Sequence, residues 1–406
     1  MHVKQSITFN KTQPQNRAVI FCMYYLICIT LLDCIFSGTP IVSIFSYSSI
    51  LIELVITIYI IYCNGWKLRI NISGIISIII LTSCLLFTML NAGFKSSIFA
   101  LFKEYNIVFV CVILSGLKYD KSVINQIIKI FVLFGLSSLV FSILFEDFIA
   151  QAIHASNAYT VEIESFFSNK NQFGRVLYMS AVAAFMYYVN EEHRSVYLVI
   201  TVILSFATVF SFSRTSLVAL MFFYGTYYIL KSKMSVVKRF LVLFCIIIFF
   251  LVIFSNENIV EYVNRIIVRK DADLSSRMNL WNIGLEYTYN HPFFGAGEYM
   301  AENIINSKGL FFSEFHSEYI YRLVVSGIHI TILYGFIIYV QMKRLFKQRY
   351  TNSYAIVAFS GFISFMVYMC FEQYPVYRFS IEGMILATLL YMIPNINMKN
   401  ERNVNE

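Results

Sequence analysis

Charged residues are scarce in this chain of 406 residues: they make up 13% of it, whereas apolar residues make up 58%. A soluble domain carries a charged share of about 25%, so the composition excludes an ordinary soluble core. Apolar runs of about 20 residues, the length of a helix that crosses a bilayer, recur from end to end. The composition therefore predicts an all-α polytopic membrane protein.

Paired cysteines are also missing. The eight cysteines stand singly, mostly inside or beside apolar runs, and no CxxC pair occurs. This spacing excludes a zinc-ribbon site and a disulfide framework, and it favours buried apolar cysteines. The outer connections contain no convincing DxD-like motif and no cluster of histidine and cysteine ligands. We therefore predict no metal and no cofactor.

A cleavable leader is not indicated either, because the first apolar run lacks a small-residue cleavage pattern and is expected to stay as a helix. Counting runs near 20 residues gives about twelve spans. They are expected at 18–36, 41–62, 70–90, 98–116, 124–145, 172–190, 196–212, 215–231, 237–254, 319–341, 354–371 and 378–394.

The net charge of +8 is explained by topology and does not call for a nucleic-acid partner. Every strongly basic connection follows an even-numbered span or flanks a terminus, so all of them fall on one side. By the positive-inside rule that side is cytoplasmic, and both termini lie there. The opposite side receives short turns, an acidic loop near 146–171 and a large insertion near 255–318.

The large insertion is the expected functional element of a single polytopic domain that spans 1–406. Backbone amides in contact with lipid would have no partners, so the insertion must fold above the bilayer or line a watery cavity. Long loops on a rigid scaffold carry chemistry more often than packing.

Arg214 lies in a tight turn, FSFSRTSLVAL, between two apolar runs. A guanidinium in this position needs an anionic partner. Glu372 and Glu382, at the outer end of the last spans, could supply an internal ion pair, and the side chain could also snorkel to the interface. A bound phosphate is the alternative, because its oxygens match the guanidinium fork.

Arg277 and Trp281 are four residues apart in SSRMNLW and share a helix face. Alone, they indicate a surface cation–π contact, but with Arg214 on the same side a phosphate site becomes plausible. FFSNKNQFGR adds Lys170, Asn171 and Arg175 at the outer end of the sixth span.

His316 lies in FHSEYIYR, just before the tenth span. A histidine at a helix start is more often a structural hydrogen-bonding group, yet histidine can also accept a proton from a hydroxyl nucleophile. Glu314 and Glu318 could orient it, although Glu318 and Arg322 are also spaced as an ordinary helical ion pair. Arg378 is a further candidate for substrate binding.

The SRT turn, the SRxxLW helix followed by NHPFFGAG, and HSEYIYRLVVSG before a late span resemble the O-antigen ligase and Wzy-type polymerase superfamily of bacterial envelope polysaccharide synthesis. The resemblance implies a GT-C-like fold with one large periplasmic loop in the inner membrane. It also implies transfer of an undecaprenyl-diphosphate-linked glycan to an acceptor hydroxyl. Arg214 and Arg277 match the arginines that hold the diphosphate, and His316 matches the histidine proposed to activate the acceptor. Many relatives have Asn after that histidine, where this chain has Ser317.

The expected function is polysaccharide polymerase: metal-independent, inverting transfer to the sugar hydroxyl of another lipid-linked repeat unit, with a chain-length regulator as a further partner. The departure at Ser317 favours the polymerase over an O-antigen ligase that uses lipid A-core. A lipid-linked oligosaccharide flippase is the alternative from another class. It is kept open by charges in or near apolar runs that the spacing does not explain. These charges are Asp33, Glu53, Lys103, Glu104 and Glu382.

Overall fold

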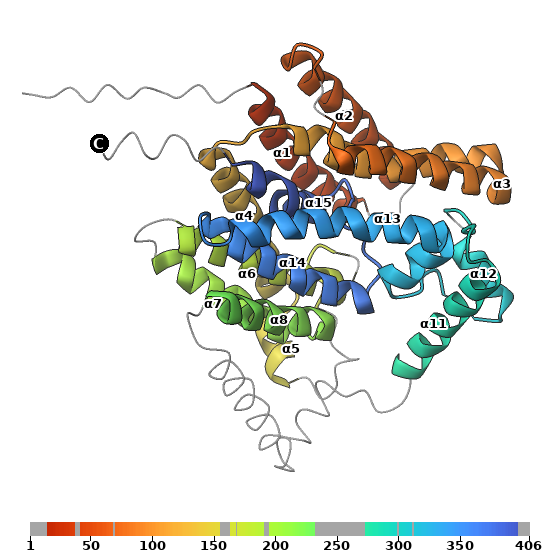
Figure 1. Ribbon diagram of the computed structural model, residues 1–406. Helices are drawn as coiled ribbons and strands as arrows, with labels where there is room; N and C mark the ends of the chain where they lie inside the picture. The colour runs from red at the N-terminus through yellow and green to blue at the C-terminus, as the bar shows by residue number, and fades with distance from the viewer. Residues whose placement is uncertain are drawn as a thin grey trace, which may run out of the picture.

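The protein is built from helices (Figure 1). The computed structural model describes residues 14–36, 41–67, 70–154, 163–167, 169–190, 195–231, 273–298, 300–310 and 312–396. Within these ranges the regular secondary structure is helical apart from one isolated bridge between Tyr119 and Ile396, and turns and loops connect the helices. The helices are α1 (Pro14–Ile35), α2 (Ile41–Cys63), α3 (Ile72–Val108), α4 (Lys121–Phe145), α5 (Phe148–His154), α6 (Lys170–Asn190), α7 (Ser195–Phe210), α8 (Arg214–Lys231), α11 (Asp273–Asn290), α12 (Ala301–Ser307), α13 (Glu318–Gln348), α14 (Ser353–Phe371) and α15 (Ile381–Ala387). Short turns of π-helix and 3₁₀-helix extend α3 and α15, namely η1 (Phe109–Leu114), η2 (Thr388–Met392) and η3 (Ile393–Asn395).

Each apolar run predicted to span the membrane coincides with a helix wherever the structure describes it. The run at 237–254 lies outside the described residues. Among the described residues, five helices are long and apolar enough to cross a membrane by their length and composition, and three shorter apolar helices accompany them. The all-helical class is therefore confirmed, while the count of about twelve spans and the GT-C-like topology stay predictions.

The third and fourth predicted spans are the two arms of one hairpin within α3 and η1. Gly93 breaks the helix with φ +82° and ψ 175°, a conformation that essentially only glycine adopts. Asn71 at the start of the first arm donates to the Ser115 hydroxyl beyond the second arm, at 3.0 Å. A Cβ on Gly74 would lie 3.1 Å from Val112. Gly93 thus reverses the chain and lays the two arms side by side.

The large insertion folds onto α13 through a small core of its own. Leu280 of α11, Ile305 of α12 and Phe315 are fully buried together with Val324 and Val325 of α13. Gly327 then breaks α13 with φ +75°, so that the helix turns from this small core into the main bundle. The part of the insertion that is described, from 273 onward, is an ordered cap on the bundle. The segment between α11 and α12 contacts the α3 hairpin, because Asn91 donates to the Gly295 carbonyl at 3.1 Å.

Connections predicted to share a side of the membrane meet at one end of the bundle. Asn395, after α15, donates to the Ser115 carbonyl at 2.8 Å, and Arg344, late in α13, donates to Asn395 at 2.7 Å. Asn71 also bonds to Ser115. The basic segments around 67, 118 and 343–349 therefore lie near one another, and the connections that start α6 and α8 and end α14 meet at the opposite end.

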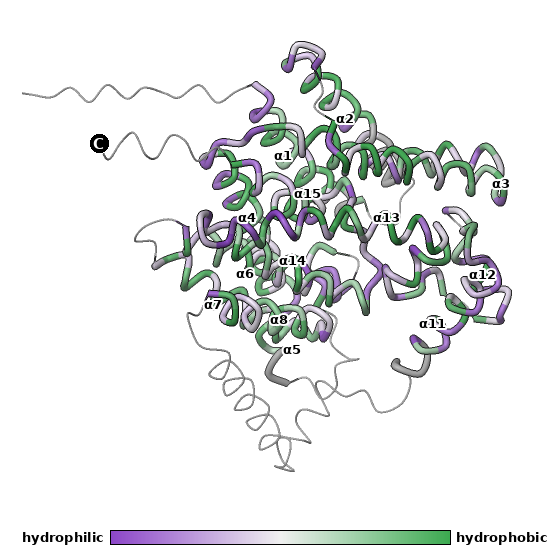
Figure 2. Tube along the Cα trace, viewed as in Figure 1, coloured by the Kyte–Doolittle hydropathy of each residue, from purple (hydrophilic) through white to green (hydrophobic). Residues whose placement is uncertain are grey.

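Helix α6 is the central element. It packs against α4, α7, α8 and α14, and nearly all of its residues from Phe173 to Tyr187 are buried. Its sequence contains Tyr, Ser and Arg, so it is less apolar than the outer helices. Figure 2 shows hydrophobic residues along the outer helices, and more hydrophilic ones along α11. The outer helices expose large apolar side chains, such as Leu133, Phe206 and Ile332, which suits contact with lipid.

Candidate active site

The turn that carries Arg214 packs against the first turn of α6. Arg214 is the first residue of α8 and is half-buried, and the Ser213 and Ser216 hydroxyls lie 2.8 Å apart at the helix start. A Cβ on Gly174 would lie 2.3 Å from the Ser213 Cβ, so the two backbones are in close contact here. The glycine thus brings the starts of α6 and α8 together. Arg214 and the α6 residues Asn171 and Arg175 were predicted to share this end, and they do.

Glu372 at the end of α14 is the point where the insertion meets the bundle. Its Oε1 accepts from Asn171 Nδ2 of α6 at 3.0 Å and from Arg277 Nη2 of α11 at 3.2 Å. Arg277 Nη1 also donates to the Phe371 carbonyl at 2.7 Å. That carbonyl belongs to the last turn of α14, where intrahelical partners are lacking. One guanidinium therefore caps the end of α14 and pairs with its terminal carboxylate.

Opposing effects act on the Glu372 carboxyl. Burial raises its pKa above the ordinary value of 4.5, and the positive charges of Arg277 and Arg175 oppose that rise. Burial prevails, and Glu314 adds a small effect in the same direction. The carboxyl thus lies within the field of both arginines as well as in hydrogen-bond contact with Arg277.

Arg175 belongs to a separate, more deeply buried pair. Its Nη2 donates to Glu382 Oε1 at 3.0 Å and its Nη1 to the Tyr368 hydroxyl at 3.3 Å. The guanidinium lies 3.9 Å from the ring centroid of Tyr374. Arg378 is exposed and lies 5.4 Å from the centroid of the same ring. Glu372 and Glu382, the carboxylates considered for Arg214, are thus ion-paired with Arg277 and Arg175 respectively.

The segment that carries His316 is connected to α11 and to the end of α14 by two hydrogen bonds. Trp281, one helical turn after Arg277, donates its indole N–H to the Phe315 carbonyl at 3.1 Å. The Phe315 N–H donates to Gln373 Oε1 at 3.1 Å, and Gln373 follows Glu372. His316 itself is half-buried, with φ +51°, and its ring meets Phe312 edge to face. Both bonds therefore tie the histidine segment to the Arg277–Glu372 pair.

Glu318 forms the helical ion pair that its spacing indicated. Its Oε1 accepts from Arg322 Nε at 2.8 Å, and both side chains are buried. Arg322 also pairs with Glu104 of the α3 hairpin at 2.7 Å and lies 3.9 Å from Glu298 of the insertion. The Tyr321 hydroxyl donates to Glu298 at 2.5 Å. Glu318 thus belongs to a buried network that joins the hairpin, the insertion and α13.

Lys170 is the first residue of α6 and is half-buried. The other described histidines lie elsewhere, as their sequence context indicated. His291 is exposed at the end of α11 and stacks on Tyr287, while His329 is exposed on α13 and meets Phe87 edge to face. The side chain of His154 lies outside the described residues.

Sequence reasoning missed Gln373 and the role of Glu372 as a meeting point. The signal was the polar FEQ stretch that directly follows the apolar run of α14. It also left Glu104 and Glu382 unexplained, and the structure pairs them with Arg322 and Arg175. Among the described residues, no group of three or more His, Cys, Asp or Glu side chains is arranged to hold a metal ion.

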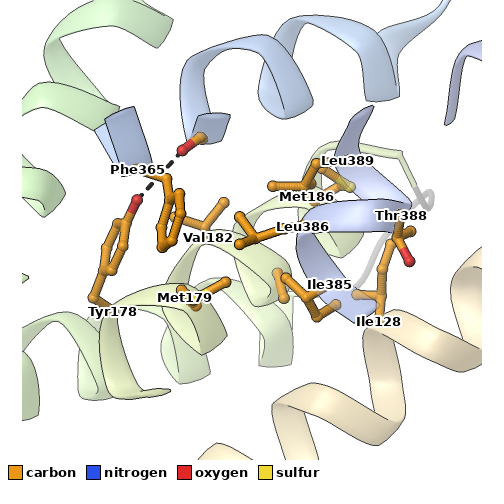
Figure 3. A pocket seen from close by; sticks show the side chains of 12 residues that line it. Ile128, Tyr178, Met179, Val182, Met186, Phe365, Ile385, Leu386, Thr388 and Leu389 are labelled. Atoms are coloured by element: carbon orange, nitrogen blue, oxygen red, sulfur yellow. Dashed lines mark hydrogen bonds between the residues drawn. The ribbon is translucent and has the colours of Figure 1, made fainter. Parts of the chain in front are cut away.

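An apolar pocket lies deeper in the bundle, among α4, α6, α14 and α15 (Figure 3). Met179, Val182, Phe365 and Leu386 line it, and Tyr178 lies at its edge, where its hydroxyl bonds to Ser364. Phe365 stacks on Tyr368, the partner of Arg175. The pocket therefore begins about one helical turn below the buried Arg175 pair.

Arg214, Arg277, Trp281 and His316 lie within one stretch that can be compared with known families. Residues 199–335 match the O-antigen ligase family. The resemblance seen in the sequence is confirmed over this stretch, which covers the α7–α8 turn, the insertion and most of α13. The match supports an enzyme of the O-antigen ligase or polymerase type. Comparison with curated proteins and with solved structures gave no significant match.

Proposed function

We propose that the protein is a membrane polysaccharide polymerase. In this proposal it transfers an undecaprenyl-diphosphate-linked glycan to the sugar hydroxyl of another lipid-linked repeat unit. The observation that carries the proposal is the link between Arg277 and His316: Trp281 and Gln373 both hold Phe315, next to the histidine, while Glu372 joins Arg277 to α6. The match to the O-antigen ligase family over residues 199–335 supports it.

The chemistry is a single displacement with inversion. The acceptor oxygen bonds to the anomeric carbon, the bond from that carbon to the diphosphate oxygen breaks, and His316 accepts the hydroxyl proton. The leaving group is undecaprenyl diphosphate, and Arg214 and Arg277 stabilise the negative charge that develops on it. The two guanidinium groups supply the positive charge that stabilises the leaving group, so the reaction needs no metal or cofactor in this proposal.

The supporting residues position the substrates. Lys170, Asn171 and Arg378 offer donors to the oxygen atoms of the proposed diphosphate and sugar sites, and Arg175 adds positive charge from below. The single N–H of Trp281 is bound to the Phe315 carbonyl, so Trp281 contributes its ring to the proposed substrate site. Glu318 is buried and paired with Arg322, so in this proposal it does not contact substrate and acts on the site only through Arg322. Apolar surfaces between helices take the polyprenyl tail. The reaction takes place on the periplasmic side of the inner membrane, with both termini in the cytoplasm and a chain-length regulator as a further partner.

An O-antigen ligase is the second candidate, favoured by the description of the matching family. Both enzymes break the same bond and differ in the acceptor. A deletion strain separates them. Lipid A-core with a single repeat unit indicates a lost polymerase, whereas free lipid-linked polymer indicates a lost ligase.

The direct test uses purified protein with a defined undecaprenyl diphosphate oligosaccharide. We expect longer glycans and released undecaprenyl diphosphate in matching amounts. Arg277→Ala should abolish both products, and Lys308→Ala serves as the matched control, because Lys308 forms an exposed pair with Glu286 in the same insertion. Movement of the lipid-linked glycan across vesicles without lengthening would instead indicate a flippase and overturn the proposal.

A further inference from the structure

Arg277 uses its two terminal nitrogens differently. Nη1 donates to the Phe371 carbonyl, a backbone group fixed at the end of α14, at 2.7 Å. Nη2 donates to the Glu372 carboxylate at 3.2 Å. A carboxylate and a phosphate offer the same kind of acceptor oxygen to a guanidinium. One arm of the fork is thus anchored to the fold, and the other is bound to a group that a phosphate can replace.

The surroundings of Glu372 suit a larger anion. Asn171 donates to the same oxygen at 3.0 Å from the first turn of α6, a helix of 21 residues whose N-terminus carries a partial positive charge. The electrostatic influence of both Arg277 and Arg175 reaches the carboxyl. Glu372 itself ends α14, where the helix dipole disfavours a negative side chain.

Accessibility separates this pair from the buried ones. The side chains of Arg277 and Glu372 are 16% and 12% exposed. Those of Arg322 and Glu104 are 5% and 3% exposed. A ligand can reach the first pair from outside, whereas the second is enclosed within the fold.

We propose that Glu372 is a resident anion that occupies the diphosphate site until the lipid-linked donor displaces it. The inference rests on the proposed function and adds an internal competitor to it. Before the donor binds, the carboxylate neutralises Arg277 and accepts a hydrogen bond from Asn171, and it swings away when the donor diphosphate arrives. Because Gln373 holds the Phe315 N–H, the same movement links donor binding to the position of His316.

The test measures the binding of undecaprenyl diphosphate to purified full-length protein in detergent at pH 8. Glu372→Gln removes the competing charge and keeps an oxygen that can accept from Asn171. We expect its Kd to fall by about tenfold, since one unit charge at the edge of the site opposes the diphosphate. Glu286→Gln, at the exposed pair with Lys308, is the matched control and should leave the Kd unchanged.

A second variant, Glu372→Asp, keeps the charge but withdraws it by one methylene, so its Kd should lie between those of the wild type and Glu372→Gln. Unchanged or weaker binding by folded Glu372→Gln overturns the inference and gives the carboxylate a purely structural role. Failure of the proposed function looks different, because Arg277→Ala would then leave undecaprenyl diphosphate binding intact.

Discussion

Arg322 lies at the centre of a buried ion-pair network whose contribution to stability can be predicted quantitatively. Its guanidinium bonds to Glu104 at 2.7 Å and to Glu318 at 2.8 Å, and lies 3.9 Å from Glu298. The Arg322 side chain is 5% exposed and none of the three carboxylates exceeds 3%. The substitution Arg322→Met keeps the length and apolar stem of the side chain and removes its charge.

The loss of Arg322 leaves a cluster of buried carboxylates without their cation. Removing one partner of a buried ion pair costs about 3–5 kcal/mol, because the remaining charge is unpaired and desolvated. We expect Arg322→Met to lower the free energy of unfolding by this amount. Adding Glu104→Gln removes one of the stranded charges and should restore about 1–3 kcal/mol, which is the coupling expected of residues in one network.

The assay is unfolding of the purified protein in mixed micelles by increasing SDS, followed by circular dichroism. Lys308→Met breaks the exposed pair with Glu286 and should cost about 1 kcal/mol or less. The reasoning is refuted when Arg322→Met costs no more than Lys308→Met. It is also refuted when Glu104→Gln makes the double variant less stable than Arg322→Met alone.

Further predictions concern the hinge, the site and its pH response. Gly93→Ala should destabilise the hairpin by about 1–3 kcal/mol in the same unfolding assay, since alanine disfavours φ +82°; an unchanged stability would contradict the reversal. Arg277→Lys keeps the charge but cannot reach both Phe371 and Glu372, so kcat/KM should fall by about 10–100-fold, whereas full activity would show that the fork is not used. His316→Ala should lower kcat by about 10²–10⁴-fold and spare donor binding, measured by turnover and Kd, and a normal kcat would remove the proposed base. Because the pKa of Glu372 is raised by burial in the folded state, stability should fall as pH rises through the window above 4.5, and Glu372→Gln should flatten this slope in unfolding measured against pH.

The helices were predictable because each apolar run carries its own signal. The predicted runs at 70–90 and 98–116 coincide with the arms of the α3 hairpin, and the one glycine between them supplies the reversal at Gly93. The environment of α6 was harder to predict than its position. Its polar residues Arg175, Tyr178 and Ser180 are buried among other helices and do not face lipid. Composition alone does not separate these two environments.

The partners within the site were much less predictable. Arg322 and Glu104 are separated by 218 residues, and Asn171 and Glu372 by 201. Helical spacing finds pairs three or four residues apart, such as Glu318 and Arg322, but carries no information on which helices become neighbours. The sequence therefore indicated a shared end for the arginines and left open which carboxylate each would meet.

Accessibility gives the arginines of this protein different tasks. A buried guanidinium enclosed by carboxylates, as at Arg322, cannot exchange its partners without opening the fold, so its contribution is to hold the hairpin, the insertion and α13 together. Arg277 has one bond to the backbone and one to a reachable carboxylate, so it can change partners while staying in place. An enzyme that binds a diphosphate and releases it in every cycle needs an arginine of the second kind. This reasoning singles out the Arg277–Glu372 pair, among the described ion pairs at this end of the bundle, as the place where the proposed diphosphate substrate would bind.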